Sequence, residues 1–155
     1  MAFRTITRIN IKKTKLSTRT LMMLISKDIK AVIQSRFRNS IGPDGSHWAG
    51  VSYRTGKPLL ITGSLMRSFK NSYTSNMAIV GTSDIRARLH QFGGTIKAKN
   101  KPYLHFKIND KWVKVKEVKI KARPFNGFNQ ELFERYKTMV ASYLSQELKD
   151  SLGGK

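Results

Sequence analysis

Residues 17–37, STRTLMMLISKDIKAVIQSRF, carry the clearest structural pattern in the chain. Their apolar side chains recur at steps of three and four residues, the spacing of one helix face, at Leu21, Leu24, Ile25, Ile29, Val32, Ile33 and Phe37. Ser17 or Thr18 can cap the N-terminus. Because the other face is polar and basic, we expect a helix that packs on a core through one side only.

A second apolar stripe lies near the C-terminus, at Leu132, Phe133, Tyr136, Met139, Val140, Tyr143, Leu144 and Leu148. Asn126 or Asn129 can cap this helix, and Gly153-Gly154 can end it. A short helix over Leu65 to Phe69, capped by Thr62 or Ser64, is also expected.

The central part of the chain alternates between short strands and a short helix. Tyr73 to Gly81 predicts strand, turn and strand, with the turn at Ser75-Asn76. Ile85 to Phe92 predicts a helix ended by Gly93-Gly94, because glycine readily takes the left-handed conformation after a helix. A basic loop is expected from Gly94 to Lys101.

Tyr103 to Ile108 and Lys111 to Ile120 predict a β-hairpin around the two-residue connection Asn109-Asp110. In the second strand the valines change parity near Lys116-Glu117, so a β-bulge or a strand break is expected there.

These patterns together predict an α+β fold: an antiparallel sheet with the two long helices, N-terminal and C-terminal, packed on one face, plus a short helix. A chain of 155 residues has room for one core, so residues 1–155 are expected to form a single domain.

The chain is strongly basic, with 30 Lys and Arg against 9 Asp and Glu and a net charge of +21. Residues 1–70 hold 14 basic and 2 acidic side chains, residues 71–128 hold 12 and 3, and residues 129–155 hold 4 and 4. Such a charge requires an anionic partner, and the first two thirds of the chain are expected to face it.

The sequence contains no cysteine, which excludes disulfides and thiolate zinc sites and suits a reducing cytoplasm. Residues 1–15 lack an apolar run long enough for a signal peptide or a membrane span. With five basic and no acidic residues, this segment is expected to be a basic N-terminal arm that is flexible when alone.

No arrangement for catalysis is apparent, so we expect a protein that is not an enzyme and uses no metal or cofactor. The three histidines, His47, His90 and His105, lie in separate segments without a second ligand at helical spacing. The acidic residues are scattered and lack the convergence that a metal-dependent nuclease needs. His90 is interpreted as a side chain that bonds the last carbonyls of its helix.

Five short motifs occur in a recognisable order. They are Pro43-Asp44-Gly45 with Trp48, Leu60 with Thr62-Gly63 and Leu65, Val80-Gly81-Thr82, His90-Gln91-Phe92-Gly93-Gly94, and Ala122-Arg123-Pro124-Phe125. Together they resemble the tail-completion, or virion morphogenesis, family of long-tailed phages, over about residues 37–128. The domain is then expected to comprise the N-terminal arm, a family-like region at 16–128 and the C-terminal helix at 129–152.

The resemblance implies a structural virion protein that completes the tail or neck at the head–tail junction. It implies a homo-oligomeric ring, expected to be a hexamer, that contacts tail terminator and head-connector proteins and surrounds the genomic DNA, with no membrane. The host cytoplasm is then the site of assembly.

Candidates for the DNA path are Lys97, Lys99, Lys101, Lys114 and Lys116, which could also form an ordinary solvated surface. Arg123-Pro124-Phe125 is interpreted as a structural strand exit in preference to a contact between subunits. The alternative function is a sequence-nonspecific nucleic-acid-binding protein, which the charge and the aromatics Tyr103 and Trp112 among lysines would support.

Overall fold

The computed structural model describes residues 3–7, 18–52 and 54–153. Their elements follow in the order β1 (Phe3–Thr7), α1 (Arg19–Asn39), α2 (Ser64–Arg67), β2 (Lys70–Tyr73), β3 (Ala78–Thr82), α3 (Ile85–Phe92), β4 (Gly94–Lys97), β5 (Leu104–Ile108), β6 (Lys111–Val115), β7 (Glu117–Ile120) and α4 (Gln130–Gly153). The predicted α+β class, with long helices near both ends, is confirmed.

Helix α1 is the centre of the packed part of the molecule. Most of the predicted apolar face is buried, and with Met22 it supplies much of the core through Leu21, Ile25, Ile29, Ile33 and Phe37. The predicted Leu24 is instead 45% exposed. Thr18 stands at the N-cap position, but its hydroxyl accepts no bond from the helix N–H groups and donates to the Ser75 carbonyl. The helix ends at Ser40, which adopts a left-handed conformation with φ of 56°.

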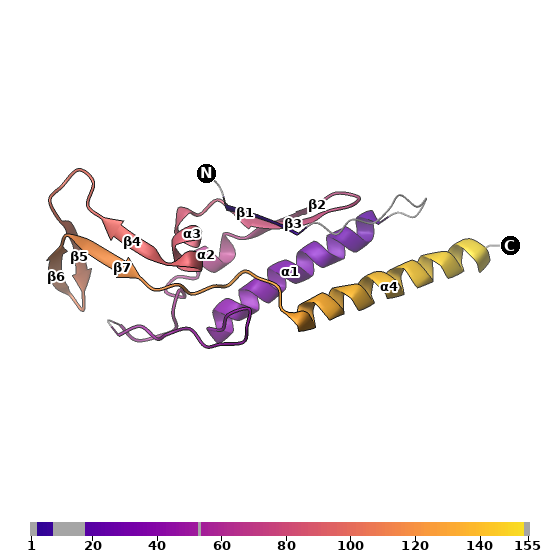
Figure 1. The fold of residues 1–155 in the computed structure, drawn as a ribbon, viewed down its shortest axis with the longest axis horizontal. Helices are drawn as coiled ribbons and strands as arrows, with labels where there is room; N and C mark the ends of the chain where they lie inside the picture. The colour runs from indigo at the N-terminus through magenta and orange to yellow at the C-terminus, as the bar shows by residue number, and fades with distance from the viewer. Residues whose placement is uncertain (1–2, 8–17, 53, 154–155) are drawn as a thin grey trace.

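The strands form three separate antiparallel sheets among the described residues, where the sequence predicted one. Their orders are β1-β3-β2, β4-β7 and β5-β6. Helix α1 packs on β2 and β3, and α4 lies along α1, so α1 separates the sheet from α4 (Figure 1). The prediction of a single sheet was therefore wrong. The chain bends at Lys116, so β6 and β7, on either side of the bend, pair with different strands, β5 and β4.

Part of the predicted basic N-terminal arm forms a strand. Phe3–Thr7 forms β1, which pairs with β3 along the edge that β2 leaves open. An unpaired strand edge offers a row of backbone donors and acceptors, and β1 satisfies them. Residues 1–2 and 8–17 of the remaining prediction lie outside the described residues.

The predicted hairpin of β5 and β6 is confirmed. Asn109 and Asp110 both have positive φ, 48° and 59°, which is the requirement of the two-residue turn that matches strand twist. The predicted basic loop from Gly94 to Lys101 begins instead as strand β4, because β7 provides a pairing partner. We call residues 94–121 the hairpin arm; it extends to one end of the long axis (Figure 1).

Caps fix the ends of α3 and α4. The Asp84 carboxylate accepts from the Arg86 backbone N–H at 3.0 Å, a cap that the sequence analysis missed. Asn129 caps α4 by accepting from the Leu132 N–H at 2.9 Å, as one of the two predicted candidates. Gly93 ends α3 with φ of 71° and ψ of −176°, outside the left-handed helical region that was expected.

The reason for glycine at position 93 is a close approach of two segments. A Cβ atom there would lie 2.9 Å from both the Ala122 nitrogen and the Ile120 oxygen, which are backbone atoms. The end of α3 and the end of β7 therefore touch through a surface that only glycine permits.

We predict that Gly93→Ala lowers the free energy of unfolding by about 1–3 kcal/mol, because it adds backbone strain and a backbone clash. Gly50→Ala is the matched control, since no atom lies within 4 Å of its added Cβ. Chemical denaturation of both variants measures the difference, and equal stabilities would contradict the close approach.

Candidate functional site

Three of the five family-like motifs meet at the segment that follows β7: Pro43-Asp44-Gly45 with Trp48, the motif at 90–94 and the motif at 122–125. Residues 122–127, which we call the exit segment, connect the hairpin arm to α4 and pass over the core. Phe125 lies at their centre and is fully buried. Its ring stacks on Phe37 with centroids 5.0 Å apart and meets the edge of Phe69 at 5.4 Å. The exit segment is thus fastened to α1 by an aromatic cluster.

Gln91 supports the backbone of the exit segment from α3. Its Oε1 accepts from the N–H groups of Phe125 and Asn126, both at 3.1 Å, and its Nε2 donates to the Asn126 carbonyl at 2.8 Å. The next backbone bond runs from the Arg123 N–H to the His90 carbonyl at 2.7 Å. A buried glutamine side chain therefore takes the place of a neighbouring strand.

Arg36 supports the same segment from α1, and the sequence analysis missed it. Its Nη1 donates to the carbonyls of Phe125 at 3.1 Å and Gly127 at 2.8 Å. The side chain is buried, and desolvation lowers the pKa of Arg36 from its usual value. Its position three residues after Ile33 and one before Phe37, on the apolar face, was the available signal.

The Pro43-Asp44-Gly45 turn and Trp48 approach the exit segment from another side. The Trp48 indole donates to the Pro124 carbonyl at 2.9 Å, and the ring meets Phe37 edge-on at 5.6 Å. Asp44 closes the turn by accepting from the Ser46 hydroxyl and N–H; these bonds lower the pKa of Asp44. Gly45 has φ of 79°, as the turn prediction required.

Arg123 points outward from the exit segment and donates to the backbone carbonyls of Ala49 at 3.0–3.1 Å and Gly50 at 3.3 Å. Together with buried Phe125, this arrangement agrees with the structural interpretation of Arg123-Pro124-Phe125. Phe92, in the motif at 90–94, is not buried as Phe125 is, because 63% of its surface is exposed.

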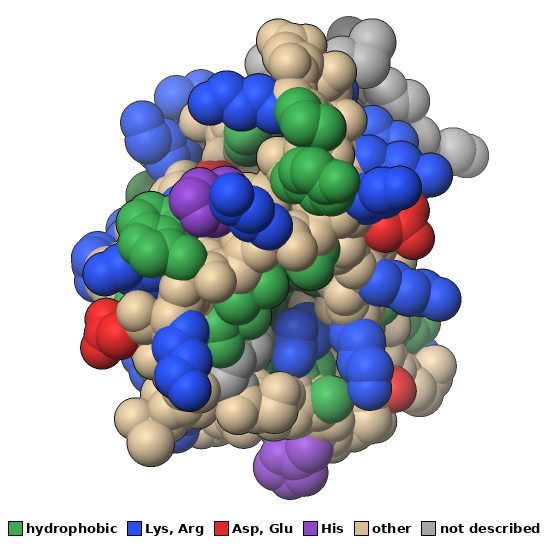
Figure 2. Space-filling view, turned by 90° about the vertical axis from the view of Figure 1, so that its left-hand side faces the viewer, with side chains coloured by type: hydrophobic (Ala, Val, Ile, Leu, Met, Phe, Trp, Pro, Cys, Tyr) green, Lys and Arg blue, Asp and Glu red, His purple; other side chains and the backbone are tan. Residues whose placement is uncertain are grey.

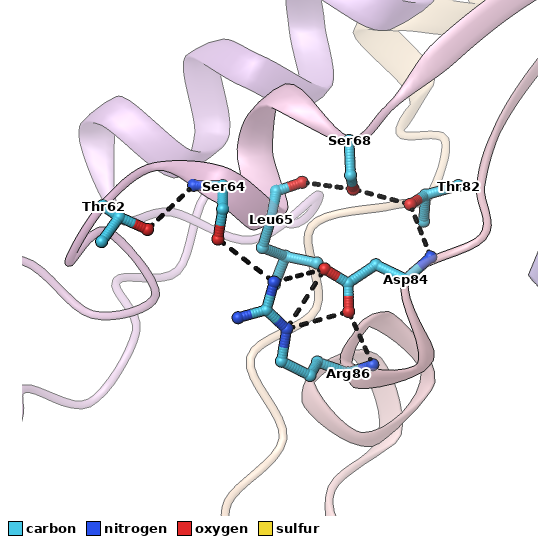
Figure 3. A network of polar contacts seen from close by, with 7 residues as sticks. All are labelled: Thr62, Ser64, Leu65, Ser68, Thr82, Asp84 and Arg86. Carbon is cyan, nitrogen blue, oxygen red and sulfur yellow. Dashed lines mark hydrogen bonds and ion pairs between the residues drawn. The ribbon is translucent and has the colours of Figure 1, made fainter.

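The Thr62-Gly63-Ser64-Leu65 motif lies beside α3 in a second polar network (Figure 3). Arg86 pairs with Asp84 and also donates to the Ser64 hydroxyl at 3.1 Å. The Ser68 and Thr82 hydroxyls share a bond of 2.6 Å, and Thr82 accepts from the Asp84 N–H at 3.0 Å. The network ties the end of β3 and the start of α3 to α2.

A shallow hollow of about 130 Å³ lies between this motif and α3. Arg54, Arg86 and His90 line it together with Thr62, Gly63 and Leu65. Burial and the nearby Arg123 and Arg86 guanidinium groups lower the pKa of His90. No described residue bonds the His90 Nδ1, so its predicted role as a cap through the side chain is not confirmed.

The five lysines predicted for the DNA path all lie on the hairpin arm and are exposed. Lys97 forms an ion pair with Glu117 at 3.5 Å. The arm as a whole holds nine lysines and only two acidic residues, Asp110 and Glu117. Figure 2 views this end of the molecule and shows basic side chains spread over it with few acidic ones.

Among the described residues, no group of three or more His, Asp or Glu side chains could hold a metal ion. None of the helices in those residues combines the length and apolar character that a bilayer crossing needs.

Comparison with known proteins places these observations in a family context. The family model described as the phage virion morphogenesis family matches residues 4–149. The Mu-like prophage FluMu G protein 2 of Haemophilus influenzae is 47% identical over 47 residues, which are 30% of this chain and 34% of that protein. The match thus spans about a third of that relative's length. No solved structure matches the chain.

We predict that Gln91→Ala lowers the free energy of unfolding by about 2–4 kcal/mol, because it removes the three hydrogen bonds that the Gln91 side chain makes to the exit segment. Gln130→Ala, which removes an exposed bond to Glu134, should change it by less than about 0.5 kcal/mol. Equal effects in urea denaturation would show that Gln91 does not hold the exit segment.

A pH dependence follows from His90. Its pKa is lower in the folded than in the unfolded state, so the unfolded chain binds more protons between the two values. Stability should fall as the pH drops through about 6.5, with a slope below about 1.4 kcal/mol per pH unit for one group. His90→Asn should flatten this slope, measured by denaturation between about pH 5.5 and 7.5.

Proposed function

The chain belongs to the phage virion morphogenesis family, and on that premise we propose that it completes the phage tail or neck at the head–tail junction. In this proposal, copies of the chain form a ring around the path of the genomic DNA, with six as the expected number. The tail terminator and head-connector proteins are the proposed neighbours.

The proposal rests on one observation: the chain is separated into a packed part, which holds the exit segment in place, and a basic hairpin arm. The family motifs hold the exit segment, from which the arm extends. The arm presents nine lysines against two acidic residues, a surface that attracts phosphate without reading base sequence.

Exposed apolar side chains support association with other protein surfaces. On the arm, 39% of Ile96, 47% of Tyr103 and 63% of Trp112 are exposed, and on α4 the exposed fraction of Phe133 is 57%. Exposed side chains of this size provide apolar area that a neighbouring subunit can cover.

The second candidate is a sequence-nonspecific nucleic-acid-binding protein, favoured by the same lysines. The two functions differ in assembly. A free binding protein needs neither a ring nor phage particles, whereas a junction protein must join a tail or a head.

We predict that the purified full chain forms rings with a central channel at high concentration or on addition of phage tails that lack it. Mass in solution and negative-stain images measure this directly. Phe133→Ser should weaken the assembly if α4 lies at the contact, while Thr138→Ser, at another exposed position of α4, should not.

A chain that stays monomeric and joins neither tails nor heads in an assembly mixture would contradict the junction function. If that chain still bound DNA with a steep salt dependence, the second candidate would replace the first.

A further inference from the structure

The hairpin of β5 and β6 has two chemically different faces. Its register places Leu104 opposite Val115 and Phe106 opposite Val113, so these half-buried apolar side chains share one face. The alternate residues form the other face, which we call the aromatic–lysine face: His105, Lys107, Trp112 and Lys114. The apolar face is half-buried, while all four residues of the aromatic–lysine face are exposed.

Trp112 organises the aromatic–lysine face. The His105 ring lies over it with centroids 4.4 Å apart, and the Lys107 ammonium lies 5.6 Å from its ring centroid. These contacts restrain the two side chains, although 63% of Trp112 remains exposed. A large aromatic side chain at a solvent-exposed hairpin tip contributes little to the core, since it lies at the far end of the arm.

The charge of this face is neutralised only weakly. Asp110 approaches Lys107 at 4.0 Å, but its carboxylate is fully exposed to solvent. Glu117 lies beyond the bend and pairs with Lys97. Ion pairs between exposed side chains are worth at most about 1 kcal/mol, so the lysines are available to a polyanion.

The spacing of the side chains on this face suits a dense array of phosphates. Same-face residues of a strand recur every ~6.8 Å, since each residue advances the strand by ~3.4 Å. Duplex DNA carries one negative charge per ~1.7 Å of its helix axis, so side chains at this spacing meet several phosphates on its surface. A two-stranded ribbon is also one of the elements that the DNA major groove can admit.

We propose that the aromatic–lysine face of the β5–β6 hairpin is the surface through which the protein contacts duplex DNA, by phosphate contacts and not by base readout. This inference rests on the proposed DNA path and deepens it. It adds Lys107, His105 and Trp112 to the predicted Lys114, and it leaves Lys111 outside the contact because Lys111 shares a face with Phe106 and Ile108.

Lys114→Gln and Lys111→Gln test the sidedness, because both remove one exposed lysine from β6 but on opposite faces. Binding of the full chain to a mixed-sequence duplex of about 30 base pairs is measured by anisotropy at about 50–200 mM salt. Lys114→Gln should reduce the slope of log affinity against log salt by about 0.9, and Lys111→Gln should leave it unchanged. Equal losses would show that net charge alone acts, and would overturn the proposal.

Tryptophan fluorescence provides an independent test. Trp48 is buried and bonded to the Pro124 carbonyl, whereas Trp112 is exposed, so only Trp112 should respond to DNA. We expect duplex DNA to change the emission of the wild type and of Trp48→Phe, and not that of Trp112→Phe. DNA binding without a change in Trp112 emission would place the contact elsewhere and overturn the proposal.

The oligomeric state separates this inference from the proposed function. If rings form normally but DNA does not change the Trp112 emission, the proposed DNA-contact face is contradicted and the proposed junction function is not. A monomer whose Trp112 responds to duplex DNA would support the face and contradict the ring. A strong preference for single-stranded over duplex DNA would overturn the duplex assignment.

Discussion

The structure depends on the burial of Phe125, because this residue brings a polar backbone into the core. A buried ring contributes apolar contact with Phe37 and Phe69, but the flanking N–H and carbonyl groups lose water at the same time. Gln91, Arg36 and Trp48 supply the missing hydrogen bonds from three other parts of the chain. Aromatic packing and backbone satisfaction are therefore inseparable at this junction.

This constraint explains why three of the family motifs are far apart in the sequence but meet in space. Trp48, Gln91 and the motif at 122–125 form the exit segment and its hydrogen bonds, and the close approach at Gly93 fixes the distance between α3 and the arm. These motifs thus have a structural role. They determine where the arm, with its nine lysines and two acidic residues, leaves the packed part of the molecule.

The molecule is divided between a packed part around α1 and an arm built from two two-stranded sheets. Two-stranded sheets gain little stability alone, so the exposed apolar side chains of the arm are consistent with a surface that an assembly covers. The net charge of +21 indicates that the partner is negatively charged, but not where on the protein it binds. The register of β5 and β6 supplies a position, because it sorts the lysines between two faces.

The sequence by itself determined the elements whose signals are local. The apolar spacing of α1, the Asn109-Asp110 turn and the parity change at Lys116 each depend on a few neighbouring residues and could be predicted. Only the tertiary structure decided the pairing of β1 with β3, the division into three sheets and the partners of Gln91 and Arg36. Those contacts join residues up to 91 positions apart, as between Arg36 and Gly127. Local propensity cannot specify them, because their energy exists only once distant segments have packed and excluded water.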